Sequence, residues 1–340
     1  MNEINNTTHA GQLIEPDKVV PSLVVVIGVA SVVFNGALLI VMTFNSKQVF
    51  ASLGSYFIFN LAIADFVTGV NSIVWGIERL STPGTFSKEA GMTLLTIFWI
   101  TVQVSFFTIF VMSTERLVAI VFPFKAALLM SKKKTTVYCI AVWIFAIVCA
   151  GLMNFKINQV QLFLTILFEV IIICIAIEYY QVFRQLRSLW QSSKNRAVYN
   201  GHNNNEAGNK MATMKSTDLK REYEVTIVVV TLAVILVVTV IPYMIANQVI
   251  LGYDLFNKPD HPAMMFSTYY FPIELLNFVV DPVVYAWRLP KYRKAFLATF
   301  SFGKDRNFKC STNGSPKTLR TTCPTEEEGQ VEMKKIYEPE

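Results

Sequence analysis

Five ionisable side chains lie inside stretches of sequence that are otherwise apolar: Asp65, Glu115, Arg116, Glu274 and Asp281. A charge in a low-dielectric environment is costly unless it is paired, neutralised or bound to a ligand. Carboxyl groups placed there can hold a proton or a cation, and an adjacent acid–base pair can form an ion pair that a partner breaks. These positions therefore predict binding or switching chemistry.

The elements that must position these residues are seven long apolar runs. A bilayer core about 30 Å thick needs about 20 apolar residues of helix. The runs cover residues 19–44, 52–77, 91–122, 135–153, 160–189, 225–251 and 262–287. Backbone groups in hydrocarbon must bond to one another, so each run is predicted to be a membrane-spanning helix. The composition agrees, because 16% charged residues is low against about 25% in soluble proteins.

The distribution of basic residues predicts the topology of this all-α membrane protein. Lysines and arginines cluster after the third run and between the fifth and sixth runs, which places those loops inside the cell and the N-terminus outside. The net charge of +6 is therefore interpreted as a topology signal and not as a surface for nucleic acid. We expect an extracellular N-terminus (1–18), a seven-transmembrane helix bundle (19–287), an amphipathic helix at the inner membrane surface (288–302) and a disordered cytoplasmic tail (303–340).

Two polar segments carry further expectations. Residues 192–217 are rich in Asn, Lys and Gly and are predicted to form a mobile loop. The short basic segment 290–300 is predicted to lie on the inner membrane surface, with Tyr292, Phe296 and Phe300 toward lipid.

Candidate modification sites lie near both ends of the chain. Asn5 and Asn6 each begin an N-glycosylation sequon, which matters only if the N-terminus is extracellular. Cys310 and Cys323 lie in the polar tail, where palmitoylation competes with the commoner case of an ordinary reduced cysteine. None of the five cysteines falls in a predicted extracellular segment, so no extracellular disulfide is expected.

Polar and proline motifs follow one another along the predicted helices. They are Asn35, Asn60-Leu-Ala-Ile-Ala-Asp65, Glu115-Arg116-Leu117, Trp143, Pro242 and Asp281-Pro-Val-Val-Tyr285. In this order they resemble the rhodopsin-like (class A) G-protein-coupled receptors over residues of about 19 to 300. The resemblance implies a plasma-membrane receptor that converts binding of an extracellular ligand into activation of a heterotrimeric G protein.

The resemblance implies roles for individual residues. Asp65, Ser105, Asn277 and Asp281 match positions that bind an allosteric sodium ion in family members, and two protonated acids without a metal are the alternative. Glu115 and Arg116 match the acidic–arginine switch, with Glu222 as a second acidic partner. The remaining positions that match switch or coupling elements are Pro123, Phe124, Tyr179, Pro242, Pro282 and Tyr285. Phe124 could equally anchor at the membrane interface.

Several departures from the family pattern narrow the resemblance. Gly91 replaces a cysteine at the start of helix three, the second extracellular loop is very short, and Ile171 replaces the proline of helix five. With Asp281-Pro, these features resemble the melanocortin receptors and, more loosely, the lysophospholipid, cannabinoid and adenosine group. The acidic cluster that binds the melanocortin ligand is absent. Phe98 stands where amine receptors have an aspartate and Leu275 where opsins have the retinal lysine, which argues against an amine receptor and an opsin.

The helix-six tryptophan that usually precedes the proline is also missing. Leu236 and Val240 occupy the usual aromatic switch positions, which predicts a loose activation relay and appreciable activity without ligand.

A ligand pocket is expected near the outer half of the bundle, where aromatic and polar residues face inward. Its predicted residues are Trp75, Phe98, Thr101, Val102, Phe163, Tyr243, Asn247, Tyr270 and Glu274. An apolar cavity with a few polar groups is the usual form of a small-ligand site. Glu274 either anchors a ligand or is a protonated core residue, and the sequence does not separate the two. A small molecule, a lipid or a peptide all remain open as the ligand.

Other classes of protein have less support. No second copy of the motifs indicates the internal repeats common in transporters. No HExxH, GxSxG or P-loop motif points to an enzyme. A receptor-like decoy or scaffold that does not couple stays open because of the missing tryptophan. Serines and threonines in the tail are expected to be targets of receptor kinases and then to recruit arrestin. Membrane lipids are expected to surround the bundle.

Overall fold

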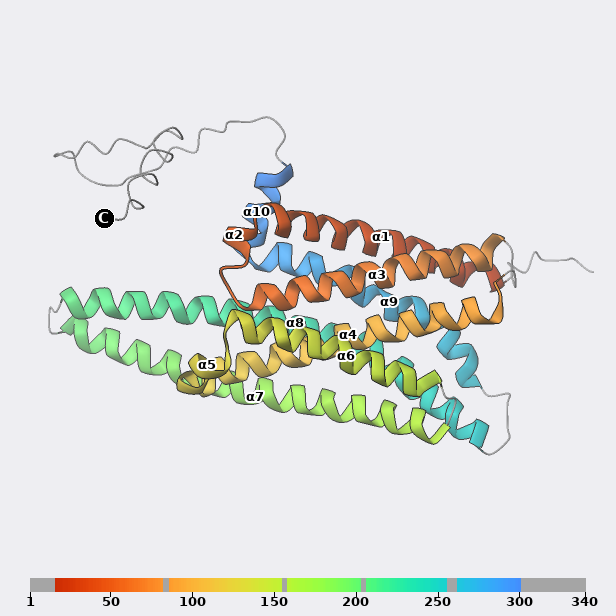
Figure 1. Ribbon diagram of the computed structural model, residues 1–340. Helices are drawn as coiled ribbons and strands as arrows, with labels where there is room; N and C mark the ends of the chain where they lie inside the picture. Colours follow the sequence, from red (N-terminus) through yellow and green to blue (C-terminus); the bar gives the residue numbers. More distant parts are fainter. Residues whose placement is uncertain (1–15, 82–85, 155–157, 203–205, 256–261, 301–340) are drawn as a thin grey trace, which may run out of the picture. The chain divides into compact units, whose positions relative to one another are not determined.

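The computed structural model describes residues 16–81, 86–154, 158–202, 206–255 and 262–300, and these form helices without a strand among them. Figure 1 labels ten helices in chain order. They are α1 (Pro16–Phe44), α2 (Ser46–Val49), α3 (Gly54–Ser81), α4 (Lys88–Val121), α5 (Pro123–Leu129), α6 (Lys132–Asn154), α7 (Asn158–His202), α8 (Glu206–Leu255), α9 (Pro262–Arg288) and α10 (Pro290–Phe300).

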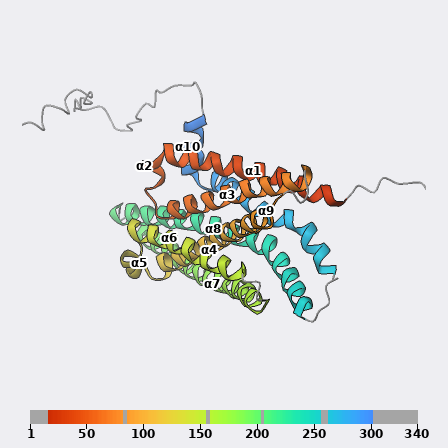
Figure 2. The ribbon, with the colours of Figure 1, turned by 45° about the vertical axis from the view of Figure 1, so that its right-hand side comes forward.

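Seven of the described helices are long and apolar enough to cross a membrane: α1, α3, α4, α6, α7, α8 and α9. They lie side by side in both ribbon views (Figures 1 and 2). The seven predicted helices are therefore confirmed, with ends that differ from the predicted ones by several residues. Large apolar side chains point away from the bundle, for example Val26, Ile144 and Val238, which are 65%, 58% and 60% exposed. Such a surface is suited to hydrocarbon.

The helix α4 is the central element of the bundle. It contacts α3, α6, α7 and α8, and every residue from 101 to 109 is buried. Because α4 is surrounded, its polar side chains can bond to several neighbouring helices. Because of this central position, α4 contributes residues to most of the sites described below.

Helices α1 and α3 pack closely at a pair of facing glycines. A Cβ atom added at Gly28 would lie 2.9 Å from the carbonyl oxygen of Gly69, and one added at Gly69 would lie 2.9 Å from that of Gly28. Small residues at a crossing let two membrane helices touch through their backbones. These glycines therefore fix α1 against α3.

The predicted loop over residues 192–217 is wrong for most of its length. Helix α7 continues to His202 and α8 begins at Glu206, so both helices extend well beyond a bilayer span (Figure 1). Adding residues to an existing helix needs no new nucleation, and the Lys, Gln, Ala, Met and Glu residues here favour helix. A polar composition therefore indicated exposure to water but not the loss of helical structure.

Candidate functional site

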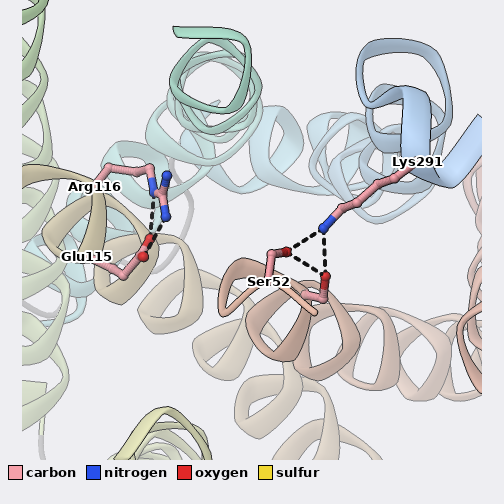
Figure 3. Close-up of polar contacts among 5 residues, drawn as sticks. Ser52, Glu115, Arg116 and Lys291 are labelled. Carbon is pink, nitrogen blue, oxygen red and sulfur yellow. Dashed lines mark hydrogen bonds and ion pairs between the residues drawn. The ribbon is translucent and has the colours of Figure 1, made fainter. Parts of the chain in front are cut away.

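A buried ion pair lies near the end of α4, at the end of the bundle called the Arg116 end below. Arg116 Nε and Nη2 donate to the two carboxylate oxygens of Glu115, each at 2.5 Å (Figure 3). Their side chains are only 10% and 5% exposed. Two parallel charge-assisted bonds give this pair a defined geometry. The side chain of Glu222, the second predicted partner of Arg116, lies outside the described residues.

A second carboxylate reaches α4 about one helical turn earlier in the chain. Glu178 of α7 accepts hydrogen bonds from Ser113 Oγ at 2.5 Å and from Thr114 Oγ1 at 2.9 Å. Glu178 therefore ties α7 to α4 beside the Glu115–Arg116 pair. The sequence offered no account of this glutamate, because the two segments are 65 residues apart and only the fold brings them together.

Two predicted switch tyrosines lie in the interior of the same half of the bundle. Tyr179 and Tyr285 are both buried, and among the described residues neither hydroxyl has a hydrogen-bond partner. A buried hydroxyl without a partner is costly, so each tyrosine gains if a rearrangement brings it a donor or an acceptor. Both tyrosines are therefore buried with a hydroxyl that the described chain leaves unsatisfied.

Helix α10 is fastened to the Arg116 end by side-chain bonds. Lys291 Nζ donates to Ser52 Oγ at 2.5 Å (Figure 3) and to Ser55 Oγ at 2.8 Å. The Tyr292 hydroxyl donates to Ser55 Oγ at 3.0 Å. Burial raises the pKa of the Tyr292 phenol above its ordinary value, so the hydroxyl stays protonated and can donate. The prediction that Tyr292 faces lipid is wrong, because its side chain is fully buried. Its hydroxyl reaches α3, and its ring lies 6.3 Å from that of Tyr285 on α9 between centroids.

The middle of the bundle holds a chain of bonded polar groups. Trp143 Nε1 donates to Asn60 Oδ1 at 2.8 Å, and Asn60 Nδ2 donates to Thr108 Oγ1 at 2.8 Å. Asn35 Nδ2 donates to the backbone oxygen of Phe278 at 2.8 Å. These bonds join α3 to α4 and α6, and α1 to α9. The motif residues Asn35, Asn60 and Trp143 therefore connect helices.

Four predicted oxygen-bearing residues meet near this layer. Ser105 Oγ donates to Asp65 Oδ1. Asp65 Oδ2, Asn277 Oδ1 and both carboxyl oxygens of Asp281 are buried without a hydrogen-bond partner within the described chain. Asp65 and Asp281 also interact electrostatically. A cluster of buried oxygens with two carboxyl groups suits a hard cation or a shared proton.

Helix α8 contains a proline, and a side chain of α9 makes the hydrogen bond that the proline cannot make. Pro242 has no N–H, so the backbone oxygen of Val238, four residues earlier, cannot receive the usual helix bond. The Tyr270 hydroxyl donates to that oxygen at 2.8 Å. Tyr270 therefore links α9 to the proline position of α8.

A cavity of about 620 Å³ opens at the opposite end of the bundle, called the Trp75 end below. Its residues come from α1, α3, α4, α8 and α9 and from the segment just before α4. Aromatic side chains form much of the wall: Trp75, Phe98, Trp99, Tyr243 and Phe271. The volume lies within the range of about 300–1,000 Å³ that is usual for small-molecule sites.

The family model described as "7 transmembrane receptor (rhodopsin family)" matches residues 35–285. The chain belongs to the rhodopsin family of seven-transmembrane receptors. Among solved structures, squid rhodopsin aligns with a TM-score of 0.69 at 18% sequence identity, covering 84% of this chain and 86% of that protein. At this identity the match supports the fold alone.

The predicted pocket of the receptor is only partly the cavity that the structure shows. Trp75, Phe98 and Tyr243 line the cavity. Phe163 is 64% exposed on the outside of α7, where it faces the surroundings of the bundle. Helix α7 is apolar on most sides, so the sequence could not show which face points inward.

The other predicted pocket residues do not line this cavity. Thr101 is buried and bonds to Thr68 at 2.7 Å, and Asn247 Nδ2 donates to the backbone oxygen of Tyr243 at 3.0 Å. Val102 borders a second, much narrower cavity. Glu274 is fully buried, and neither carboxyl oxygen has a partner in the part of the chain that is described.

The cavity also contains residues that the sequence did not indicate, among them Asn71, Ser72, Glu78, Trp99 and Phe271. The sequence did contain a signal for some of them, because positions 71, 75 and 78 share one face of a helix.

Some of the remaining predicted sites lie within the described residues and others lie outside them. Pro123 begins α5, and Phe124 on the same helix is 95% exposed. Asn5, Asn6 and Cys310 lie outside the described residues.

Proposed function

We propose that this receptor binds an extracellular ligand in the cavity at the Trp75 end and activates a heterotrimeric G protein at the Arg116 end. The Glu115–Arg116 pair carries the proposal. A buried, doubly bonded ion pair has two discrete states, and breaking it has a cost that a bound protein can offset. Glu178, Tyr179 and Tyr285 surround the same region and supply the alternative contacts that a second state needs.

The proposal includes an orientation and further partners. Basic residues gather at the Arg116 end, including Lys125 on α5, Lys132 at the start of α6 and Arg184 on α7, which favours the cytoplasmic side for this end. The N-terminus is then extracellular and the C-terminal tail is available to receptor kinases and arrestin.

The ligand acts by shifting an equilibrium between two arrangements of the helices. It must bind the coupling-competent arrangement more tightly than the resting one. Helices α8 and α9 line the cavity and also meet at the Tyr270–Val238 bond, so a ligand that moves Tyr243 or Phe271 acts on both. This gives the cavity a physical route to the proline position of α8.

The decisive test measures signalling without ligand in cells, with reporters for each G-protein class and matched surface expression. We expect a signal in the parent that Arg116→Ala abolishes and Glu115→Gln raises, because the second change removes the charge that Glu115 sets against Arg116. The two variants each remove one partner of the same ion pair, and signalling should change in opposite directions. A silent parent together with a silent Glu115→Gln variant would favour a receptor-like protein that does not couple.

We further propose that Asp65, Ser105, Asn277 and Asp281 hold a sodium ion. The buried oxygens without partners fit a hard cation, which would neutralise charge between the two aspartates. A ligand that binds only the folded state raises its stability. Sodium chloride should therefore raise the melting temperature of the purified receptor above that in choline chloride at equal ionic strength. Asp65→Asn should remove the difference and Glu274→Gln should keep it, whereas equal melting of the parent in both salts contradicts the proposal.

A further inference from the structure

The mouth of the Trp75-end cavity carries two exposed cations. Arg79 near the end of α3 and Lys88 at the start of α4 both line the cavity, and both are exposed. The first turn of α4 lies at the same place, and a helix N-terminus adds a partial positive charge. A hydrated cation exchanges its water readily for an anion. The mouth therefore favours a negatively charged group over a neutral one.

Arg79 has donors to spare for such a group. Its Nε lies 3.7 Å from Glu78 Oε2, and its guanidinium lies 5.5 Å from the centre of the Trp75 ring. A guanidinium carries five N–H donors in a planar fork that matches a carboxylate or a phosphate. The Arg79 side chain is 54% exposed, so donors that Glu78 does not occupy are open to water. An oxyanion can replace that water with charge-assisted hydrogen bonds.

The nearby acids do not cancel the positive charge. Glu78 lines the cavity, but its side chain is only 7% exposed and has contacts within the protein. Glu89 on α4 is exposed and is not among the lining residues, and Glu274 is fully buried behind them. The described lining residues thus include one acid, which is buried, and two bases, which are exposed. The excess charge of the cavity is positive.

Below the mouth the cavity wall is apolar and aromatic. The ring of Phe271 meets Trp75 at 5.8 Å and Phe98 at 5.4 Å between centroids, and all three line the cavity. From Lys88 to Phe98 the axis of α4 rises by roughly 15 Å. Burial of apolar surface against such a wall is favourable. The cavity therefore offers a place for an apolar body that continues inward from a charged head.

We infer that the cavity binds an organic anion with an apolar body. Its carboxylate or phosphate group pairs with Arg79 and Lys88 at the mouth. Its body lies against the rings of Trp75, Phe98 and Phe271. The inference rests on the proposed function and names the ligand class of that same cavity.

Four small probes separate the charge of this ligand from its body. The acid 4-phenylbutyrate carries both features, 4-phenylbutan-1-ol lacks the charge, 4-phenylbutylamine reverses the charge, and acetate lacks the body. Dissociation constants come from the thermal stabilisation of the purified full-length receptor in nanodiscs of zwitterionic lipid as each probe is titrated. Zwitterionic lipid carries no net charge, so it does not itself concentrate the acid or the amine.

The acid should bind about 5-fold tighter than the alcohol and about 10-fold or more tighter than the amine, because partly exposed ion pairs each add a modest gain. Acetate should stabilise least. Arg79→Gln and Lys88→Gln should each lower the preference for the acid over the alcohol to about twofold, and the double variant should abolish it. Lys133→Gln, at an exposed lysine of α6 at the Arg116 end, is the matched control and should keep the preference. Each preference is a ratio within one variant, so it holds even where a variant is less stable.

An anion of this kind can come from the water or from the bilayer, and a further probe separates the two sources. Dodecanoate has the same carboxylate on a chain that enters lipid. Stabilisation by dodecanoate at a lower total concentration than by 4-phenylbutyrate, with the same loss in the double variant, assigns the ligand to the membrane. The reverse order assigns it to the water, and both orders support an anionic ligand.

Three results overturn the inference: binding of the amine as tight as that of the acid, a preference for the acid that survives in the double variant, or no stabilisation by 4-phenylbutyrate up to about 10 mM, where even very weak complexes form. Because no G protein is present, the outcome is independent of the Arg116 experiment. Acid binding without signalling contradicts only the coupling proposal. Signalling without acid binding contradicts only the ligand class.

Discussion

The two halves of the bundle satisfy their buried carboxyl and amide oxygens differently, although the hydroxyls of Tyr179 and Tyr285 in the Arg116 half also lack a partner among the described residues. Toward the Arg116 end the carboxylates meet donors, as Glu115 does through Arg116 and Glu178 does through α4. From the centre to the Trp75 end, Asp281, Glu274 and Asn71 have buried oxygens that no described residue satisfies. The difference separates groups that hold one arrangement of the helices from groups that gain when a ligand, a cation or a proton arrives.

The largest expected effect compares two asparagines of α3. Asn60→Leu removes the partner of both the Trp143 indole and Thr108, so we expect it to destabilise the receptor by about 1–3 kcal/mol. Asn71→Leu removes an oxygen that has no partner, so it should have little effect or a slight stabilising one. Thermal unfolding of the purified receptor without ligand measures both. Equal losses would show that the two asparagines contribute alike and that the contrast between the halves is not energetic.

A smaller effect is expected where a bond holds α7 against α4. Glu178→Leu deletes the acceptor for Ser113 and Thr114, which should raise ligand-independent signalling by about 3- to 10-fold, because a hydrogen bond contributes about 0.5–1.5 kcal/mol net. Glu169→Leu is the matched change on the same helix. It removes a 3.0 Å bond from Gln248 of α8 and leaves the contact with α4 intact. A similar rise in both variants would contradict a special role for the contact between Glu178 and α4.

The smallest effect is expected at the proline of α8. Tyr270→Phe leaves the backbone oxygen of Val238 without its 2.8 Å bond and should loosen the link between α8 and α9. We expect a change in ligand-independent signalling of about twofold, in line with a bond of about 0.5 kcal/mol. Tyr269→Phe, at a neighbouring residue that is 49% exposed, should leave signalling at the parent level.

The sequence predicts the fold well because one physical constraint repeats along it. Each apolar run must span the same hydrocarbon thickness, so length and composition suffice to find seven helices. Motif residues such as Asn60 and Trp143 could be recognised by their order along the chain. Their partners could not, because bonds such as Trp143–Asn60 join residues that only helix packing brings together.

The rotation of each helix is the part that the sequence leaves undetermined. Phe163 was assigned to the pocket although it lies on an outward face, since an evenly apolar helix offers no polar side to orient it. Helix rotation and tilt depend on neighbouring helices. Glu78 and Asn71 line the cavity although the sequence did not indicate them, because packing against α1, α4 and α9 sets the rotation of α3. The long α7 and α8 likewise show that polar composition does not end a helix.

The contact between Gly28 and Gly69 has a consequence for the gene that encodes this receptor. Every missense change of one base in a glycine codon introduces a residue with a Cβ atom, and at either position that atom would lie 2.9 Å from a backbone oxygen that has no freedom to rotate away. At Gly76 such an atom would lie 3.0 Å from the backbone oxygen of Pro21 and 2.6 Å from the side-chain atom Val25 Cγ2. Point mutations in these three codons should therefore separate α1 from α3 and leave the protein in the endoplasmic reticulum, whatever the identity of the new residue.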